Sequence, residues 1–296
     1  MNEPTVDAES LQRAIIKEAL WVLGLGNYPR LGRLVTPLLR PPVGRFARFA
    51  ATFENDVATV GFREAAGNGI DDFIKEVDIS GACPLPRVGP LLLAANHPGT
   101  IDFLLTASIL PRDDLKIVAS NVSLVRLLPA TVDHFIFIAS DSVVGDSYSR
   151  MGALRESLRH LKQGGALLTF PSGRLDPDPT IRPREARDEL ASWSSSIALM
   201  LSKVPECQVA ATMVSGVLSA GWFRSPVTWY RKEPHYKQKV AELFQVMGHL
   251  FFPTRGQLSP RIAFGRPQDW AELSPAGDTA VATAAIIEQA ASLLPG

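Results

Sequence analysis

The sequence predicts an α/β fold in which a mostly parallel sheet is flanked by helices and preceded by an N-terminal helical region. Beyond about residue 90, short apolar runs alternate with longer segments of helical periodicity, which is typical of βαβ units. Before residue 70, apolar residues recur at helical spacing instead. We therefore expect an N-terminal helical region at 1–70, an α/β domain at 71–270 and a C-terminal helix at 271–296.

In the N-terminal region, residues 8–68 are expected to be helical, because apolar residues such as Leu11 and Ile15 recur at helical spacing. Gly24 and Gly26 are expected to end the first helix. The pair at 41–42 is Pro-Pro, and proline lacks the amide N–H that a helix interior needs. We therefore expect a break there, after which residues 43–62 continue as a helix.

In the α/β region, the loose alternation of residues 73–79 suggests a first strand, and the stretch at 81–90, rich in Pro and Gly, is expected to be a loop. The predicted strands that follow are 91–95, 115–119, 135–138, 166–169 and 208–214, with a late strand at 261–265. The predicted helices are 101–110, 148–163, 185–203, 236–251 and an Ala-rich amphipathic helix at 278–294.

The bulk composition excludes some classes of protein. Lys+Arg and Asp+Glu both number 30, so the chain is neutral, unlike a general nucleic-acid-binding protein. The first residues are polar and acidic and do not resemble a secretory signal, and no apolar run approaches the roughly 20 residues that span a bilayer. Cys83 and Cys207 lie far apart, and we expect reduced, buried thiols. A cytoplasmic protein that could lie on a membrane surface, but not cross it, is expected.

Two segments end apolar runs abruptly in polar, Gly and Pro residues. Residues 91–102 have the sequence LLLAANHPGTID, and residues 166–174 have the sequence ALLTFPSGR. Each is expected to be a buried parallel strand that opens into a loop at its carboxyl end. Ligand sites collect at these strand ends in open α/β sheets. His97 and Asp102 therefore fall where chemistry is expected, at a spacing that lets an imidazole and a carboxylate meet.

The chemistry that His97 and Asp102 could perform is proton transfer. A neutral imidazole can take the proton of a hydroxyl group near neutral pH, and a carboxylate on the other ring nitrogen would fix its tautomer. Gly99 would let the backbone turn tightly, and Pro98 and Thr100 suit the start of a helix. The alternative is that His97 is a loop or capping histidine and that Asp102 complements a helix dipole.

Four segments together resemble those of a known family. Asn96, His97 and Asp102 form an Asn-His-x4-Asp motif, and residues 135–141 (FIFIASD), 170–174 (FPSGR) and 209–214 (VAATMV) follow in order. This arrangement resembles the glycerolipid acyltransferase superfamily of the PlsC-like type, over roughly residues 85–265. The resemblance implies an O-acyltransferase, similar to 1-acylglycerol-3-phosphate acyltransferases, which transfers groups other than amino-acyl groups. It would move a fatty acyl chain from acyl-CoA or acyl-carrier protein to a hydroxyl of a lyso-lipid or glycerol phosphate in phospholipid synthesis.

The resemblance also assigns site residues. His97 would be the general base and Asp102 would orient it. The residues implied for substrate binding are Asn96, Gly99, Ser140, Phe170, Pro171, Ser172, Gly173 and Arg174. No metal or cofactor is implied, since the acyl donor is a co-substrate.

The chain departs from the family pattern at two positions that bear on the acceptor. The second block of phosphate-recognising members carries an arginine where this chain has Ser140, and the glutamate of the third block is Ser172 here. A serine cannot replace the charge of an arginine on a phosphate. Arg174, Arg182 or Arg184 could supply a replacement charge. The His-Pro pair and the FPSG segment look closer to the lyso-ornithine-lipid and hemolysin-like branch.

Two alternative functions remain at this stage. The two serines motivate a lipid-binding protein with weak catalysis or none, whereas the intact His97 and Asp102 pair favours an enzyme. A thioesterase or lipase would use water as the acceptor. Ser172 is a poor candidate nucleophile for such an enzyme, because no Gly-x-Ser-x-Gly segment is present.

The remaining histidines and acidic loop residues give no metal site. The other histidines, at 134, 160, 235 and 249, lack the spacing of metal ligands. The loop residues Asp141, Asp146, Asp176 and Asp178 lack a calcium-loop pattern, and we expect solvated turn residues.

Two segments have the composition of a membrane interface. Residues 28–53 hold five arginines and no acidic residue, interleaved with apolar side chains. Residues 222–232 have the sequence WFRSPVTWYRK, which mixes aromatic and basic residues. The first segment could equally be a pair of helices that pack on the α/β domain with their arginines outward. For the second segment we favour lipid contact.

Overall fold

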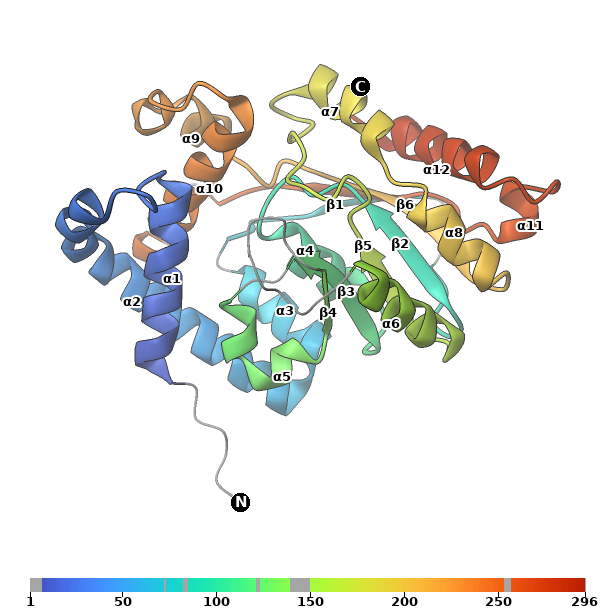
Figure 1. Ribbon diagram of the computed structural model, residues 1–296, viewed down its shortest axis with the longest axis horizontal. Coiled ribbons are helices and arrows are strands. Elements are labelled where there is room, and N and C mark those ends of the chain that lie inside the picture. Colours follow the sequence, from blue (N-terminus) through green and yellow to red (C-terminus); the bar gives the residue numbers. More distant parts are fainter. Residues whose placement is uncertain are drawn as a thin grey trace.

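A seven-stranded sheet forms the centre of the computed structural model, which describes residues 7–71, 73–81, 85–120, 123–138, 150–252 and 257–295 (Figure 1). The strands in these ranges are β1 (Asp78–Ser80), β2 (Leu91–Ala95), β3 (Leu115–Ser120), β4 (Phe135–Ile138), β5 (Ala166–Thr169), β6 (Gln208–Ser215) and β7 (Arg261–Phe264). Their order is β1-β7-β6-β2-β5-β3-β4. β6 and β7 pair in antiparallel fashion and the other neighbours pair in parallel, so the predicted mostly parallel sheet is confirmed.

The central strand β2 is buried along its whole length. It pairs with β5 on one side and with β6 on the other, so every residue of Leu91–Ala95 is enclosed. A parallel strand that is covered on both faces needs apolar residues at successive positions rather than alternating ones. This is why the run LLLAA predicted the strand correctly.

The two faces of the sheet carry different layers of helices. On one face Leu91, Leu93 and Ile117 pack with α3 (Phe62–Asp71) and α4 (Asp102–Ile109). On the other face Leu92 and Leu167 pack with α6 (Arg150–Lys162), α8 (Ser196–Lys203) and α12 (Thr279–Leu293), as Figure 1 shows. Successive side chains of a strand point to opposite faces, so a single apolar run contributes side chains to the hydrophobic cores on both faces of the sheet.

Two elements of the α/β region differ from the prediction. The helix expected at 185–203 is split into α7 (Pro183–Glu189), the 3-10 turn η2 (Leu190–Ser192) and α8, with the buried Trp193 between them. The strand expected at 73–79 is only Asp78–Ser80. The N–H groups of Phe73 and Ile74 instead donate to the carbonyl of Ile70 and close the last turn of α3.

The N-terminal region consists of α1 (Ala8–Val22) and α2 (Pro29–Val60), and the predicted break at Pro41-Pro42 is wrong. The carbonyls that lose a partner to the three internal prolines belong to Arg33, Pro37 and Leu38, which are exposed and can be hydrated. Leu39 and Val43 pack into the core formed with α1, and such packing stabilises the helix across the prolines. The helix ends at Gly61, whose φ is 92°.

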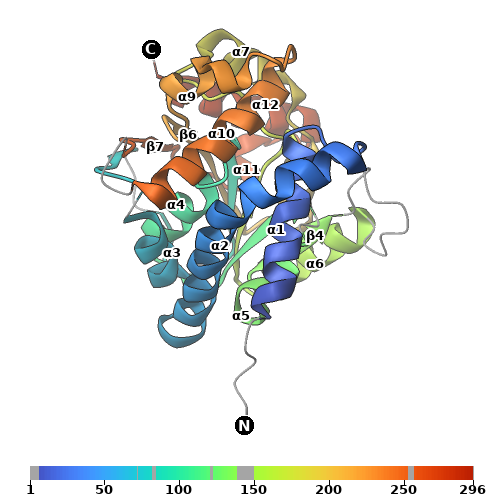
Figure 2. The same ribbon diagram turned by 90° about the vertical axis from the view of Figure 1, so that its left-hand side faces the viewer.

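The remaining short elements lie around this framework. They are η1 (Val125–Leu127), α5 (Pro129–Val132), α9 (Ala220–Arg224), η3 (Pro226–Thr228) and α11 (Trp270–Leu273). The long helix α10 (Pro234–Phe251) lies beside α2 (Figure 2), and Arg45 donates a hydrogen bond to the carbonyl of Leu250. In the part of the chain that the structure describes, no helix has both the length and the apolar character to cross a membrane.

Candidate active site

Asn96 fixes the point at which the chain leaves strand β2. Its side-chain Nδ2 donates to the carbonyl of Val214 at 2.8 Å, and the N–H of Val214 donates to its Oδ1 at 2.7 Å. The buried side-chain amide therefore continues the pairing of β2 with β6 one residue beyond Ala95. Because both polar atoms of its side chain bond to β6, Asn96 fixes the backbone at the carboxyl end of β2, where His97 follows.

His97 and Asp102 lie in contact, as their spacing predicted. His97 Nδ1 lies 2.9 Å from Asp102 Oδ2, and the N–H of Gly99 donates to the same oxygen at 3.1 Å. The Asp102 side chain is buried, whereas 30% of the His97 side chain is exposed. The carboxylate thus holds one ring nitrogen inside the protein while part of the imidazole remains accessible.

The segment at 170–174 packs directly against His97. The Phe170 ring lies 4.5 Å from the imidazole, centroid to centroid. The N–H of Gly173 donates to the carbonyl of Phe170 at 2.9 Å and closes a turn around Pro171 and Ser172. Gly173 has φ of 68°, a conformation that favours glycine. The structure therefore brings together the two strand ends that the sequence singled out.

Asp176 was expected to be a solvated turn residue, and this prediction is wrong. It is buried, and its Oδ2 accepts a hydrogen bond of 2.8 Å from the backbone N–H of His97. In return its own N–H donates to the carbonyl of His97 at 2.7 Å. This two-way link joins the loop after β5 to the loop after β2 and fixes the backbone at His97.

Asp178 is also buried rather than solvated. Its two carboxylate oxygens accept hydrogen bonds from the N–H groups of Thr180, Gly216 and Leu218, at 2.9 to 3.0 Å. It therefore ties the same loop to the end of β6. A Pro-rich loop has no regular hydrophobic periodicity, so no pattern in the sequence distinguishes a buried aspartate there from an exposed one.

Helix α10 supplies two residues that the sequence analysis missed. Gln238 is buried, and its Nε2 donates to the carbonyls of Pro98 and Asp176 at 2.9 and 2.7 Å. Glu242 accepts a hydrogen bond from the N–H of Thr100. Gln238, Glu242 and Gln245 recur at helical spacing, so polar residues on the inward face of an amphipathic helix were the available signal.

Gly99 is required for space rather than for its backbone angles. The chain does turn here, since the carbonyl of Gly99 accepts a hydrogen bond from the N–H of Asp102 at 3.4 Å, but Gly99 is not among the glycines with positive φ. A Cβ at Gly99 would lie 3.0 Å from Glu242 Oε1 and 3.2 Å from Val217 Cγ2. Glycine at this position therefore lets α10 approach the His97 loop closely.

The carboxylates around His97 make it a strong base. Burial alone would lower the pKa of His97, but Asp102, Glu242 and Asp176 outweigh it and raise the pKa to about 9. Burial raises the pKa of Asp176 to about 6, and it also raises the pKa of Glu242. The favoured charge state of the site thus has a positive imidazolium among carboxylates.

Two of the arginines that the sequence offers as replacement charges, Arg174 and Arg182, differ in their surroundings. Arg174 pairs with Glu189, with its Nε 2.8 Å from Oε1, and its side chain is 58% exposed. Arg182 is more enclosed and lies 3.4 Å from Glu185 and 3.5 Å from the side-chain oxygen of Gln238. Ser140, together with Asp141, Asp146 and Cys83, lies outside the described residues.

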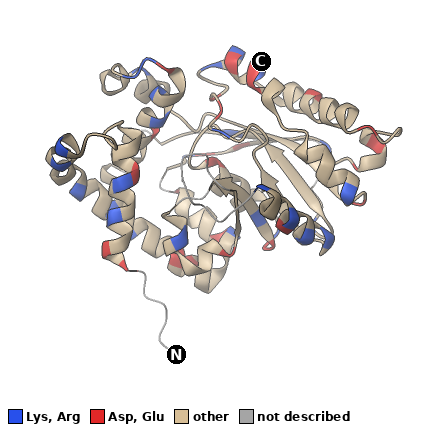
Figure 3. Ribbon diagram, viewed as in Figure 1, with Lys and Arg blue, Asp and Glu red and all other residues tan. Residues whose placement is uncertain are grey.

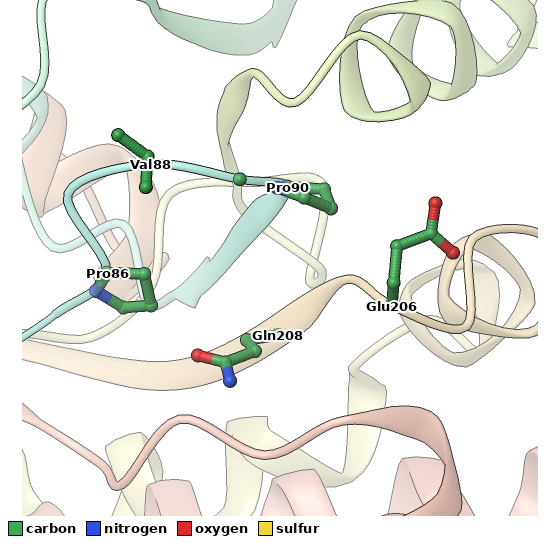
Figure 4. Close-up of a pocket in the computed structure, with 6 residues that line it drawn as sticks. Pro86, Val88, Pro90, Glu206 and Gln208 are labelled. Atoms are coloured by element: carbon green, nitrogen blue, oxygen red, sulfur yellow. The ribbon is translucent and has the colours of Figure 1, made fainter.

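A surface cavity lies away from this chemistry. It has a volume of about 190 Å³ and is lined by residues that include Pro90 and Gln208 (Figure 4). Pro90 precedes β2 and Gln208 begins β6, so the cavity lies at the amino ends of the strands, opposite His97. Elsewhere, Cys207 is a buried free thiol, as predicted. Within the described ranges no group of three or more His, Cys, Asp or Glu side chains could hold a metal ion.

The comparison with protein families gives one match. Residues 76–206 match the family described as Acyltransferase, and this segment includes His97, Asp102 and the turn at 170–174. This part of the chain is thus similar to an acyltransferase domain, in agreement with the resemblance to acyltransferases that the four sequence segments suggested.

Other comparisons add only distant likeness. The crystal structure of the 1-acyl-sn-glycerophosphate (LPA) acyltransferase PlsC from Thermotoga maritima is similar at 12% sequence identity and a TM-score of 0.47. The likeness covers 99% of this chain and 100% of that chain. No curated protein matches the sequence.

Proposed function

We propose that the protein transfers a fatty acyl chain from a thioester, acyl-CoA or acyl-carrier protein, to a hydroxyl group of a lyso-lipid or glycerol phosphate. The observation that carries this proposal is the His97 imidazole, held through Nδ1 by the buried Asp102 at 2.9 Å and still partly exposed. This arrangement suits Nε2 to act on a substrate hydroxyl, within a segment that matches the acyltransferase family.

The proposed reaction uses His97 as both base and acid. His97 Nε2 takes the proton of the acceptor hydroxyl as its oxygen attacks the thioester carbonyl. The C–S bond then breaks, an ester forms, and the thiol leaves with the proton from the imidazolium. Asp102 stabilises the imidazolium throughout, and no covalent enzyme intermediate is required. The acyl donor is a co-substrate, and the step that we propose uses no other cofactor.

The proposed acceptor binds beside the turn at 170–174. The partly buried Phe170 gives this side of the site an apolar surface beside His97, whereas Pro171 is buried. Ser172 is partly exposed and Gly173 is exposed. Arg174 and Arg182 are basic side chains in and after this turn that could meet an anionic headgroup, with Arg184 and Ser140 as further contacts to test. Both arginines also face glutamates, which favours acceptors whose headgroup does not depend on a strong phosphate clamp.

We further propose that the protein works as a peripheral protein on the cytoplasmic face of the cell membrane. Exposed apolar side chains on α2 include Leu31, Leu34 and Leu38, which recur on one side of the helix next to Arg30 and Arg33. Basic positions on α2 lie on the same side of the molecule as α9 and α10 (Figures 1 and 3). Such a surface suits anionic lipid.

The segment at 222–232 is a second part of the proposed membrane-contacting surface. Tyr230 donates from its hydroxyl to the carbonyl of Leu23, and Arg231 donates to the carbonyl of Val22 at 2.8 Å. These bonds place the exposed Trp229 and Tyr230 beside the turn between α1 and α2. Residues far apart in sequence therefore form one aromatic and basic region, which favours a lipid surface over a set of unrelated exposed side chains.

A thiol-release assay with palmitoyl-CoA tests the proposed reaction. The acceptors would be glycerol-3-phosphate, several lysophospholipids and lyso-ornithine lipid, with products identified by mass spectrometry. We expect acceptor-dependent release that falls on the order of 10²–10⁴-fold in His97→Ala. Release that no acceptor stimulates would identify a thioesterase. No release with either palmitoyl-CoA or palmitoyl-carrier protein would favour a lipid-binding protein.

A further inference from the structure

Glu242 lies next to the catalytic histidine but comes from a different part of the chain. It belongs to α10, beyond the segment at 76–206 that matches the acyltransferase family. Its carboxylate accepts the N–H of Thr100, two residues before Asp102, and it lies against Gly99. Glu242 therefore contacts the backbone that joins the two members of the pair.

The charges that face His97 come from three elements. Asp102 begins α4, Asp176 lies in the loop after β5, and Glu242 lies on α10. Lys239 lies on the same helix as Glu242; burial lowers the pKa of its ammonium group, while Glu18 of α1 and Glu242 act to raise it. Its ammonium group also lies 4.6 Å from the centre of the Trp21 ring.

A carboxylate is a costly choice for holding one N–H group. Taking a charged side chain out of water costs free energy unless an opposite charge compensates, and a neutral amide could accept the Thr100 hydrogen bond equally well. Two nearby groups can carry a positive charge, Lys239 on the same helix and the His97 imidazolium. Glu242 and the imidazolium each favour the charged form of the other. The use of glutamate here therefore has an electrostatic reason.

We infer that Glu242 is a positioning residue that holds the backbone at 99–100 and stabilises the protonated form of His97 through its charge. The imidazolium is the species that forms when His97 takes the acceptor's proton, so the carboxylate would favour the transition state as well. The catalytic significance rests on the proposed acyl transfer, whereas the effect on the charge of His97 does not.

The test compares two variants that separate the hydrogen bond from the charge. Glu242→Gln keeps a side-chain oxygen for the Thr100 N–H and removes the charge, and Glu242→Ala removes both. The matched control is Glu18→Gln, which removes the other carboxylate that acts on Lys239 and is not among the groups that act on His97. The titration of His97 would be followed by NMR of the labelled imidazole in the full chain, with thermal unfolding as a check on folding.

We expect Glu242→Gln to lower the measured pKa of His97 by on the order of one unit, with Glu18→Gln close to wild type. In the acyl-transfer assay, kcat should fall while KM for the acceptor changes little. An unchanged titration of His97 in a folded Glu242→Gln variant would overturn the inference. Because the NMR titration needs no substrate, that result is independent of whether the protein proves to be an acyltransferase.

Discussion

At the scale of single residues, the environment of His97 determines when it can act as a base. A general base must be neutral before it takes a proton, but the carboxylates around His97 favour its protonated form. The same carboxylates strengthen it as a base once it is neutral. The rate of proton transfer near neutral pH therefore depends on two opposing quantities. These are the fraction of His97 that is neutral and the basicity of the neutral imidazole.

The first prediction concerns the dependence of activity on pH. With a pKa of about 9, only about 1% of His97 is neutral at pH 7, so kcat/KM should rise with pH up to about 9. In Asp102→Asn the loss of the charge should move this rise to lower pH and reduce the plateau, on the order of 10²–10⁴-fold. Thiol release measured between pH 6 and 10 checks both. A profile that is flat over this range would exclude His97 as the base.

The second prediction concerns the space at Gly99. The Cβ in Gly99→Ala would meet Glu242 and Val217 and should force α10 away from the loop, costing about 1–3 kcal/mol of unfolding free energy and reducing kcat. Gly44→Ala is the control, because Gly44 lies in α2 with no atom within 4 Å of an added Cβ, and it should stabilise by up to about 1 kcal/mol. Urea unfolding measures both. Equal stability of the two variants would contradict the close approach of α10.

At the scale of elements, the loop after β5 does more than connect β5 to α7. Its residues Asp176 and Asp178 use their carboxylates to hold the His97 loop and the end of β6. Buried backbone N–H groups need acceptors, and a carboxylate can serve several of them at once. The loop thus fixes the relative positions of three strand ends.

The third prediction follows from this role of Asp178. Asp178→Ala would leave the N–H groups of Gly216 and Leu218 without their acceptor, which should cost about 2–3 kcal/mol of unfolding free energy. Asp188→Ala, at an exposed position of α7, should change stability by less than about 0.5 kcal/mol. Thermal unfolding followed by circular dichroism would compare them. A loss as small as that of the control would mean that water replaces the carboxylate.

Helix α2 presents different sides along its length. Leu39 and Val43 pack inward, whereas Leu31, Leu34 and Leu38 are at least half exposed. A helix that exposes leucines at this spacing needs a reason beyond its own fold, because the solvent-facing side of a helix is ordinarily polar. Contact with lipid is the reason that we propose.

The fourth prediction tests this contact. The triple variant Leu31→Ser, Leu34→Ser, Leu38→Ser should lose at least tenfold in partitioning to anionic vesicles, since each buried leucine contributes about 1.5–3 kcal/mol. Val281→Ser, an exposed apolar position on α12, is the control and should bind as wild type does. Vesicle flotation measures binding. Failure of the wild type to float with either anionic or neutral vesicles would contradict the proposed surface.

At the scale of the whole molecule, stability should depend on pH through the active site. The folded-state pKa of His97 lies above its ordinary value of 6.5, so its contribution to stability is fully present below pH 6.5. That contribution is lost as the pH rises through about 9. The raised pKa of Asp176 acts in the same direction between about pH 4 and 6.

The fifth prediction is that unfolding free energy falls by up to about 3 kcal/mol between pH 6.5 and 9. In His97→Gln, which cannot take up the proton, most of this slope should disappear. Urea unfolding at a series of pH values gives the comparison. If the unfolding free energy of His97→Gln depends on pH as strongly as that of the wild type, groups other than His97 cause the dependence.

Much of the fold follows from local patterns in the sequence. The strands β2 to β6 were predicted to within a residue or so, because buried parallel strands need unbroken apolar runs with clear ends. The contact of His97 with Asp102 was also predictable, since five residues across one turn leave few alternatives. Local sequence is sufficient where the chain's own periodicity determines the structure.

The continuity of α2, the buried state of Asp176 and Asp178, and the approach of Glu242 to His97 depended on tertiary structure. Prolines are tolerated in α2 because the carbonyls that they leave unpaired belong to exposed residues, and which residues are exposed is decided only when the helix packs. Glu242 follows Thr100 by 142 positions in the chain, so no local pattern could join them. The sequence alone therefore determined the sheet and the pair at its edge, while packing between distant segments decided which charges surround that pair, because electrostatic effects depend on distance in space rather than along the chain.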